Sequence, residues 1–197
     1  MGLGEVEKHP YGIFIPKSGA RRMIIGTFPI GKFTDKARKD EIQDHEINFY
    51  YGGERNHLWK ILSQVYNREL NTKNKIKEFL EEEQIAMADV IESCQRVDGR
   101  ADDSKLKNIK WNTELSESII KNKITKLLLT SKQVEKWFHQ NIGSIPGVKE
   151  IVLVSPSGSG LRSIGRNKSF QEWSKKNPKK TATDFRLETY KTDFLNS

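Results

Sequence analysis

The chain has 197 residues, 35% of them hydrophobic, and carries a net charge of +8 with an isoelectric point near 9.4. Its aromatic content excludes a disordered chain, and no apolar run approaches the ~20 residues that a membrane span needs. The single cysteine, Cys94, excludes an intramolecular disulfide, and the scattered histidines lack zinc-type spacing. We therefore expect a cytoplasmic protein that needs no metal and no cofactor.

Short apolar runs alternate with helical patterns along the chain. The runs are typical of strands buried on both faces, and they lie at residues 22–26, 85–91, 126–130 and 150–155. Periodic apolar residues predict helices at 56–67, 73–83, 114–123, 131–140 and 168–176. Ser131 is the expected N-cap of the helix at 131–140.

This alternation predicts an α/β fold: three layers, αβα, around a short, mostly parallel four-stranded sheet. We expect a single domain over residues 1–197. A charged insertion at about 34–48 and a basic C-terminal extension would be additions to it.

The carboxyl ends of parallel strands are where ligands bind in such sheets. The segments that follow the four strands should therefore converge, and they are residues 26–33, 92–103, 130–132 and 155–162. Glycine patterns in the last segment do not indicate a nucleotide. "GLRSIGRN" has Arg166 and Asn167 where a P-loop requires Lys and Ser or Thr.

The stretch "INFYYGGERNHLWKIL", residues 47–62, joins flat aromatic side chains and two glycines to the start of a helix. The apolar residues that follow have helical spacing, so Arg55 and Asn56 stand where the turn enters that helix. Phe49 and Tyr51 can offer stacking faces to a ligand. The alternatives are that Asn56 only caps the helix and that the aromatic residues belong to the core.

Positive charge concentrates toward the C-terminus, where "GLRSIGRNK" and "WSKKNPKKT" carry many cations. This pattern is the footprint expected of a protein that binds phosphates, although a solvated surface would look the same.

Four segments, taken in order, resemble the uracil-DNA glycosylase superfamily. "IIGTFPIG" is similar to its first motif, and "FYYGGERNHLWKIL" is similar to a stretch of the hypoxanthine-DNA glycosylase branch. "VSPSGSGLR" resembles the last motif, closest to that of mismatch-specific uracil-DNA glycosylases. The second-strand segment "IAMADVIESCQRVDGRADDSKL" matches the hypoxanthine branch at Asp89, Cys94, Arg96, Gly99 and Asp102.

The resemblance implies a monofunctional DNA glycosylase that flips out a deaminated base, uracil or hypoxanthine, or a modified base, and hydrolyses its N-glycosidic bond with water. The implied partner is DNA, as a duplex with a flipped base or as a single strand, and we expect a monomer near the nucleoid. The implied catalytic residue is Asn56, which would orient the water or steady the leaving base. The implied base-binding residues are Phe28, Pro29, Phe49, Tyr51, Thr130 and Ser131. The implied DNA-binding residues are Gly26, Arg55, Ser155, Ser157, Gly158, Leu161, Arg162, Arg166 and Lys168.

Departures from the family pattern leave the base and the water-activating residue open. Phe28 stands where several branches hold an acid or amide that activates water, and Thr130 and Ser131 replace an Asn that reads the base. Within the insertion, Asp35 and His45 are candidate catalytic groups; the alternative is a solvated run of charge.

Other functions also stay open. Asp89 and Asp102 can be capping acids rather than functional ones. A roomier, hydroxyl-lined pocket would suit a bulky hypermodified pyrimidine of viral DNA, in a defence role. A non-catalytic binder of DNA with an unusual base, and an enzyme acting on a free nucleoside, are the remaining alternatives.

Overall fold

A computed structural model describes residues 2–97 and 103–195 of the chain. Its centre is a four-stranded parallel sheet in the order β3-β2-β6-β7, so the predicted three-layer αβα fold with a short four-stranded sheet is confirmed. The strands are β2 (Arg22–Gly26), β3 (Ile85–Asp89), β6 (Lys126–Leu129) and β7 (Lys149–Val152). The predicted strand at 85–91 ends at Asp89, because the chain turns at Val90 into a second sheet.

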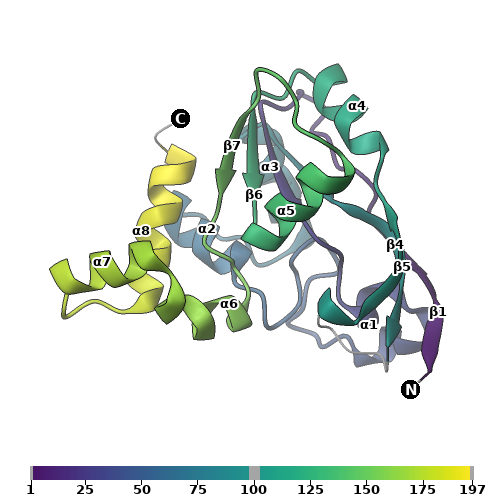
Figure 1. Cartoon of the computed structure of the whole chain (residues 1–197), viewed down its shortest axis with the longest axis horizontal. Coiled ribbons are helices and arrows are strands. Elements are labelled where there is room, and N and C mark those ends of the chain that lie inside the picture. The colour runs from purple at the N-terminus through teal and green to yellow at the C-terminus, as the bar shows by residue number, and fades with distance from the viewer. Residues whose placement is uncertain (1, 98–102, 196–197) are drawn as a thin grey trace.

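Helices cover both faces of the parallel sheet because successive strand residues point to opposite sides (Figure 1). Met23 and Ile25 of β2 pack in one core cluster with α4 (Glu114–Lys121) and α5 (Lys132–Asn141). Ile24 packs in the other cluster with α2 (Leu58–Tyr66), α3 (Lys73–Glu82) and α8 (Ala182–Leu195). The side chain of Ser131 accepts a hydrogen bond from the Val134 amide at 3.2 Å, which confirms the predicted N-cap.

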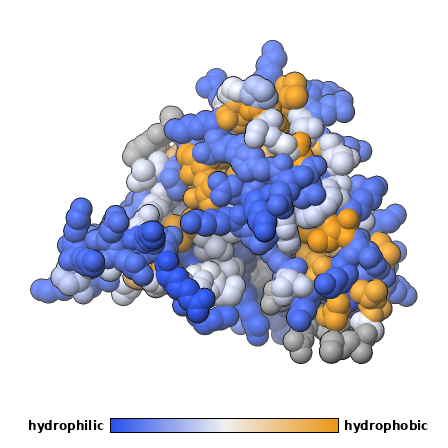
Figure 2. Space-filling view, in the orientation of Figure 1, coloured by the Kyte–Doolittle hydropathy of each residue, from blue (hydrophilic) through white to orange (hydrophobic). Residues whose placement is uncertain are grey.

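A separate antiparallel sheet, which the sequence patterns did not predict, has the strand order β1-β4-β5. Its strands are β1 (Leu3–Lys8), β4 (Ile91–Val97) and β5 (Leu106–Trp111). Figure 1 shows it on the side of the molecule away from α7 and α8. Residues 91–97 are therefore a strand, whereas the sequence placed them mainly in a loop after the second strand. Hydrophobic residues gather on this side in Figure 2, where Leu3 and Val6 are exposed.

The C-terminal part forms two helices, α7 (Lys168–Lys176) and α8. The end of α8 is held against the sheet, because Arg22 and Lys126 donate hydrogen bonds to the carbonyls of Phe194 and Asp193 at 2.9 and 2.7 Å. Cations that bind the last carbonyls of a helix also complement its dipole. Instead of a peripheral extension, α8 thus contributes buried residues to the core.

The remaining elements are short. They are α1 (Gly31–Thr34), α6 (Gly158–Ser163), η1 (Lys36–Glu41), η2 (Asp103–Lys105) and η3 (Ile164–Arg166), where η marks a 3₁₀ helix. Among the helices that the structure describes, none is long and apolar enough to cross a membrane.

Candidate functional site

Three strand ends meet at the carboxyl edge of the parallel sheet. There Gly26 ends β2, Asp89 ends β3, and Thr130 follows β6. A side chain cannot be accommodated at Gly26, because a Cβ there would overlap the Tyr51 hydroxyl and Asp89 Oδ1. The Tyr51 hydroxyl donates to Thr130 Oγ1 at 3.2 Å, and Thr130 in turn donates to the Ile25 carbonyl at 3.0 Å.

Asp89 is buried, and His9 orients its carboxylate. His9 Nε2 lies 2.9 Å from Asp89 Oδ2, and both side chains are 6% exposed. His9 Nδ1 accepts from the backbone amides of Tyr11 and Gly12 at 3.3 and 3.1 Å. The ring proton therefore resides on Nε2 and is donated to Asp89. Oδ1 of Asp89 receives no hydrogen bond from any described residue.

Tyrosine side chains surround this carboxylate. Burial, and secondarily the charge of Asp89, raises the pKa of Tyr11, Tyr50 and Tyr51. All three hydroxyls consequently stay protonated at neutral pH. Tyr50 donates its proton to the Gly12 carbonyl and Tyr11 donates to Asn48, so these hydroxyls are already used within the protein.

A buried ion pair supports the loop that follows β2. Arg96 Nε donates to Glu7 Oε2 at 2.9 Å, and Arg96 also donates to the Pro29 carbonyl. The guanidinium carbon lies 5.6 Å from the centre of the Phe28 ring. Phe28 and Pro29 are thus fixed by β1 and β4, with Phe28 itself 8% exposed.

The aromatic residues before the glycines have different environments. Phe49 is 3% exposed and packs with Trp59 and Phe14 in the core, so the structure places it away from the surface of the site. Tyr51 reaches the carboxyl edge through a left-handed backbone, with φ of 56°. A Cβ on Gly52 would collide with the Ile47 carbonyl, which explains the glycine beside this strained residue.

Asn56 joins two distant segments of the chain. The Gly158 amide donates to the Arg55 carbonyl and the His57 amide donates to the Pro156 carbonyl, each at 2.9 Å, while Asn56 bridges Ser157. We call this pairing of residues 55–57 with 156–158 the loop joint. Asn56 Oδ1 accepts the Leu58 amide at 3.0 Å and so caps the first amide of α2 from the position before the N-cap residue, His57. Its Nδ2 group has no hydrogen-bond partner among residues 2–97 and 103–195.

The loop after β7 is a chain of serine hydroxyls. Ser157 Oγ caps α6 by accepting the Gly160 amide at 2.9 Å, and it lies 3.0 Å from the Oγ atoms of both Ser155 and Ser159. Thr130 and Ser131, which the sequence assigned to base recognition, use their hydroxyls for Ile25 and for capping α5.

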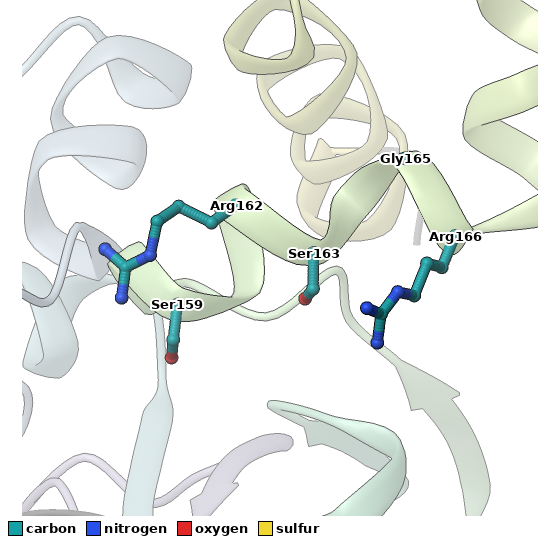
Figure 3. Close-up of a pocket in the computed structure, with 5 residues that line it drawn as sticks. All are labelled: Ser159, Arg162, Ser163, Gly165 and Arg166. Atoms are coloured by element: carbon teal, nitrogen blue, oxygen red, sulfur yellow. The ribbon is translucent and has the colours of Figure 1, made fainter.

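Exposed cations extend from the loop joint along α6 and η3 (Figure 3). Ser159, Arg162, Ser163, Gly165 and Arg166 line an open hollow of about 310 Å³. In Figure 3, Ser159, Ser163 and Arg166 project from the same side of the segment. Within the described part of the chain, neither arginine forms an ion pair, and Arg55 and Lys168 are likewise exposed and unpaired. Leu161 is half-buried on the same short helix.

The charged insertion contains a residue that caps a 3₁₀ helix and one buried carboxylate. Asp35 accepts the Ala37 amide at 2.9 Å and caps η1, and His45 is exposed. In the described ranges, no hydrogen bond links either residue to the loop joint. Glu46 is 9% exposed and binds Lys32 Nζ at 2.5 Å and the Glu54 amide at 2.8 Å. Burial opposes its ionisation, but these bonds together lower the pKa of Glu46.

Beneath the loop joint lies Arg186, which α8 contributes. Its guanidinium donates to the Ser157 carbonyl at 3.1 Å and contacts His57 Nδ1 at 3.4 Å. Arg186 is 2% exposed, and its buried Nε has no partner among the described residues. Burial, followed by the charges of Arg186 and Lys60, lowers the pKa of His57.

Four of these residues were not predicted: Glu7, His9, His57 and Arg186. His57 directly follows Asn56, and His9 stands in a "HPYG" turn, so both could have been noticed as polar groups beside turns. Glu7 and Arg186 gave no signal, because a charged residue in a strand or helix is normally assigned to the surface.

Other candidates from the sequence have clear outcomes. Cys94 is buried, which raises the pKa of its thiol to about 11 and keeps it unreactive. Gly99 and Asp102 lie outside the described residues. No cluster of metal-ligating side chains occurs in the ranges 2–97 and 103–195.

Comparisons with known proteins bear on the fold. No family model matches the chain, and no curated protein matches it. The chain is similar to the solution NMR structure of a putative uracil DNA glycosylase from Methanosarcina acetivorans, with 19% identity and a TM-score of 0.53. The match covers 93% of this chain and 99% of that one. At this identity the likeness concerns architecture: the chain shares the αβα fold of that protein.

Proposed function

We propose that the protein is a monofunctional DNA glycosylase that flips a deaminated base out of DNA, hydrolyses its N-glycosidic bond and leaves an abasic site. The observation that carries this proposal is the loop joint, in which Asn56 pairs with Ser157 directly before the segment that carries Arg162 and Arg166. Among the described residues, Asn56 Nδ2 has no hydrogen-bond partner and neither arginine forms an ion pair. The shared fold with a protein described as a uracil DNA glycosylase supports it.

The chemistry of the reaction fits the side-chain polarity at the loop joint. Glycosidic cleavage passes through an oxocarbenium-like sugar, and negative charge develops on the departing base. Because Asn56 Oδ1 is used by the Leu58 amide, Nδ2 is the group that remains to donate to that charge. Water adds its hydroxyl to the sugar carbon, and its remaining proton goes to the released base. Asn56 therefore steadies the leaving base.

The carboxylate of Asp89 favours deaminated bases over undamaged bases as substrates. Deamination converts a ring nitrogen that accepts hydrogen bonds, in cytosine or adenine, into an N–H donor, in uracil or hypoxanthine. Asp89 Oδ1 can accept from such a donor, whereas a ring nitrogen lone pair would face a carboxylate with no proton between them. We assign to Asp89 the reading of this N–H group.

The alternative substrate, a bulky modified pyrimidine, has less support than it had from the sequence alone. The hydroxyls of Thr130 and Ser131, which were to line a roomy pocket, are bonded to the protein itself.

The test uses duplex and single-stranded oligonucleotides that each carry one uracil, hypoxanthine or hydroxymethylcytosine, treated with hot alkali after incubation. We expect strand breaks at uracil or hypoxanthine. Asn56→Ala protein purified in the same way controls for contaminating glycosylases. Tight binding to the modified DNA without breaks would favour the non-catalytic binder, and breaks only at the bulky base would favour the modified-pyrimidine alternative.

A further inference from the structure

Among the residues that the structure describes, Arg186 differs from Arg96, which is also buried, in having no acidic partner. Arg96 is equally buried but pairs with Glu7 at 2.9 Å, and the partly buried Arg22 pairs with Glu83 at 3.0 Å. For Arg186 the contacts are the Ser157 carbonyl and the His57 ring, and no carboxylate approaches it within the residues that the structure describes.

A buried, uncompensated guanidinium opposes folding. Removing a charge from water costs several kcal/mol, which normally requires an ion pair and a full set of hydrogen bonds as compensation. Arg186 lacks the ion pair and leaves Nε without a partner. An anion that arrives with a ligand would supply the missing compensation.

His57 connects this buried charge to the surface. An arginine can only donate, so the Nη1 group of Arg186 makes His57 Nδ1 an acceptor and fixes the ring proton on Nε2. Within the described part of the chain, His57 Nε2 has no hydrogen-bond partner, and it is not one of the fully buried polar atoms that lack a partner. The charged groups that act on the ring are Arg186 from α8 and Lys60 from α2, both of which disfavour a second proton.

We propose that Arg186 and His57 form a phosphate-binding pair, in which the buried guanidinium supplies the positive charge and His57 Nε2–H donates to a phosphate of the bound strand. This inference rests on DNA being the ligand. The exposed Arg55, Lys60, Arg162 and Arg166 favour a phosphate as the anion, because they provide a cationic surface beside the loop joint.

The first test replaces the guanidinium of Arg186 with an uncharged side chain that still fills the space, so that no cavity is created. Arg186→Met is expected to weaken the affinity for an undamaged duplex about 10-fold or more, the scale of a lost charge-assisted hydrogen bond. The melting temperature should stay the same or rise, because an uncompensated buried charge is removed. Arg22→Met is the matched control, and it should lower the melting temperature while DNA affinity stays unchanged.

The second test is a double-mutant cycle with His57→Gln, measured by the same binding assay. If the two residues act as a pair, the double variant should bind no more weakly than Arg186→Met alone. NMR titration should also show the pKa of His57 rising toward its ordinary value in Arg186→Met.

Additive losses in the cycle, or affinity that falls only in parallel with melting temperature, would overturn the proposal. The binding measurements use undamaged DNA and the others use the protein alone, so their outcome is independent of catalysis. A protein that binds DNA through this pair but cuts no modified base would refute the glycosylase proposal alone. A protein that cuts uracil DNA with unchanged affinity in Arg186→Met would refute the phosphate pair alone.

Discussion

Only the oxygen of the Asn56 side-chain amide has a hydrogen-bond partner among the described residues, so the proposed role of Nδ2 can be tested apart from the structural role of Oδ1. Asn56→Asp keeps an oxygen for the Leu58 amide but removes the Nδ2 donor. Single-turnover cleavage should fall by about 10²-fold or more, the scale of one lost preorganised donor, with little change in melting temperature. Asn56→Ala should in addition lower stability by about 1 kcal/mol through loss of the cap.

If Asn56→Asp cleaves at the parental rate while Asn56→Ala is destabilised, the side chain is only a helix cap.

Asp89 is the second residue with a role that can be tested by an isosteric change. Asp89→Asn can still accept from His9 through its amide oxygen, but it then presents an NH₂ donor where the base needs an acceptor. Cleavage of uracil and hypoxanthine DNA should fall about 10²-fold, because a polar group is left unpaired. Asp193→Asn, at the opposite end of the sheet, is the control.

Cleavage of uracil and hypoxanthine DNA at the parental rate by Asp89→Asn would show that Asp89 serves the structure and does not read the base.

At the scale of elements, Glu46 ties the insertion to the turn that leads to Asn56. Its folded pKa is lowered, so its contribution to stability is present above the ordinary Glu pKa and disappears as pH falls through the folded value. Glu46→Gln should therefore lower the free energy of unfolding by about 2 kcal/mol at pH 7, since it breaks a buried ion pair. Urea titrations at pH 7 and at pH 3 should show this difference shrinking in acid.

Glu41→Gln is the control for this prediction. Glu41 forms an exposed ion pair with Arg38, and such a pair contributes little to the free energy of unfolding. An equal effect of both substitutions at pH 7 would contradict a special role for Glu46.

The two roles that we propose for the α6–η3 segment, phosphate binding and a wedge, can be separated by substitutions. Arg162→Gln and Arg166→Gln should each make the slope of log affinity against log salt shallower by about one unit on any DNA. Leu161→Ala should leave this slope unchanged yet slow cleavage in a duplex, because an apolar wedge acts only once the base has left the stack. Parental rates for Leu161→Ala would exclude the wedge.

For the whole molecule, α8 is an integral layer of the fold. Phe194 is 1% exposed and stacks on Tyr190, which donates to the Val154 carbonyl at 3.0 Å. Phe194→Ala should lower the free energy of unfolding by about 3–5 kcal/mol through the cavity that it leaves. Leu195→Ala, an exposed neighbour, should have almost no effect. Equal, small losses in urea titrations would place α8 outside the core.

The sequence predicted the parallel sheet because β2, β3 and β6 are buried on both faces and therefore appear as largely apolar runs, as in residues 22–26 and 126–129. The antiparallel sheet was missed because β1 exposes nearly all of its residues and β4 follows β3 after a single residue. The helix α8 was missed because Arg186 lies on its buried face. A charged residue there interrupts the periodic apolar pattern by which a helix is recognised in a sequence.

The candidate site was predicted in part. Turn glycines and polar groups after strands indicated Gly26, Asn56 and Ser157; the structure places Gly26 against Tyr51 and Asp89 and pairs Asn56 with Ser157, while their roles stay predictions. The structure also explains why spacing alone was insufficient: His9 and Arg186 reach these residues from segments that are far away in the chain. Only tertiary packing identifies such partners.

The position of α8 in the chain has a consequence for folding during synthesis. Every strand of the parallel sheet precedes it, as do α2 and α3, so only the part of the apolar face that packs against Tyr190 and Phe194 waits for α8. A nascent chain that ends before Ala182 leaves that part exposed, and exposed apolar surface favours aggregation. The loop joint also lacks Arg186 until then. We conclude that the last helix completes both the hydrophobic core and the loop joint.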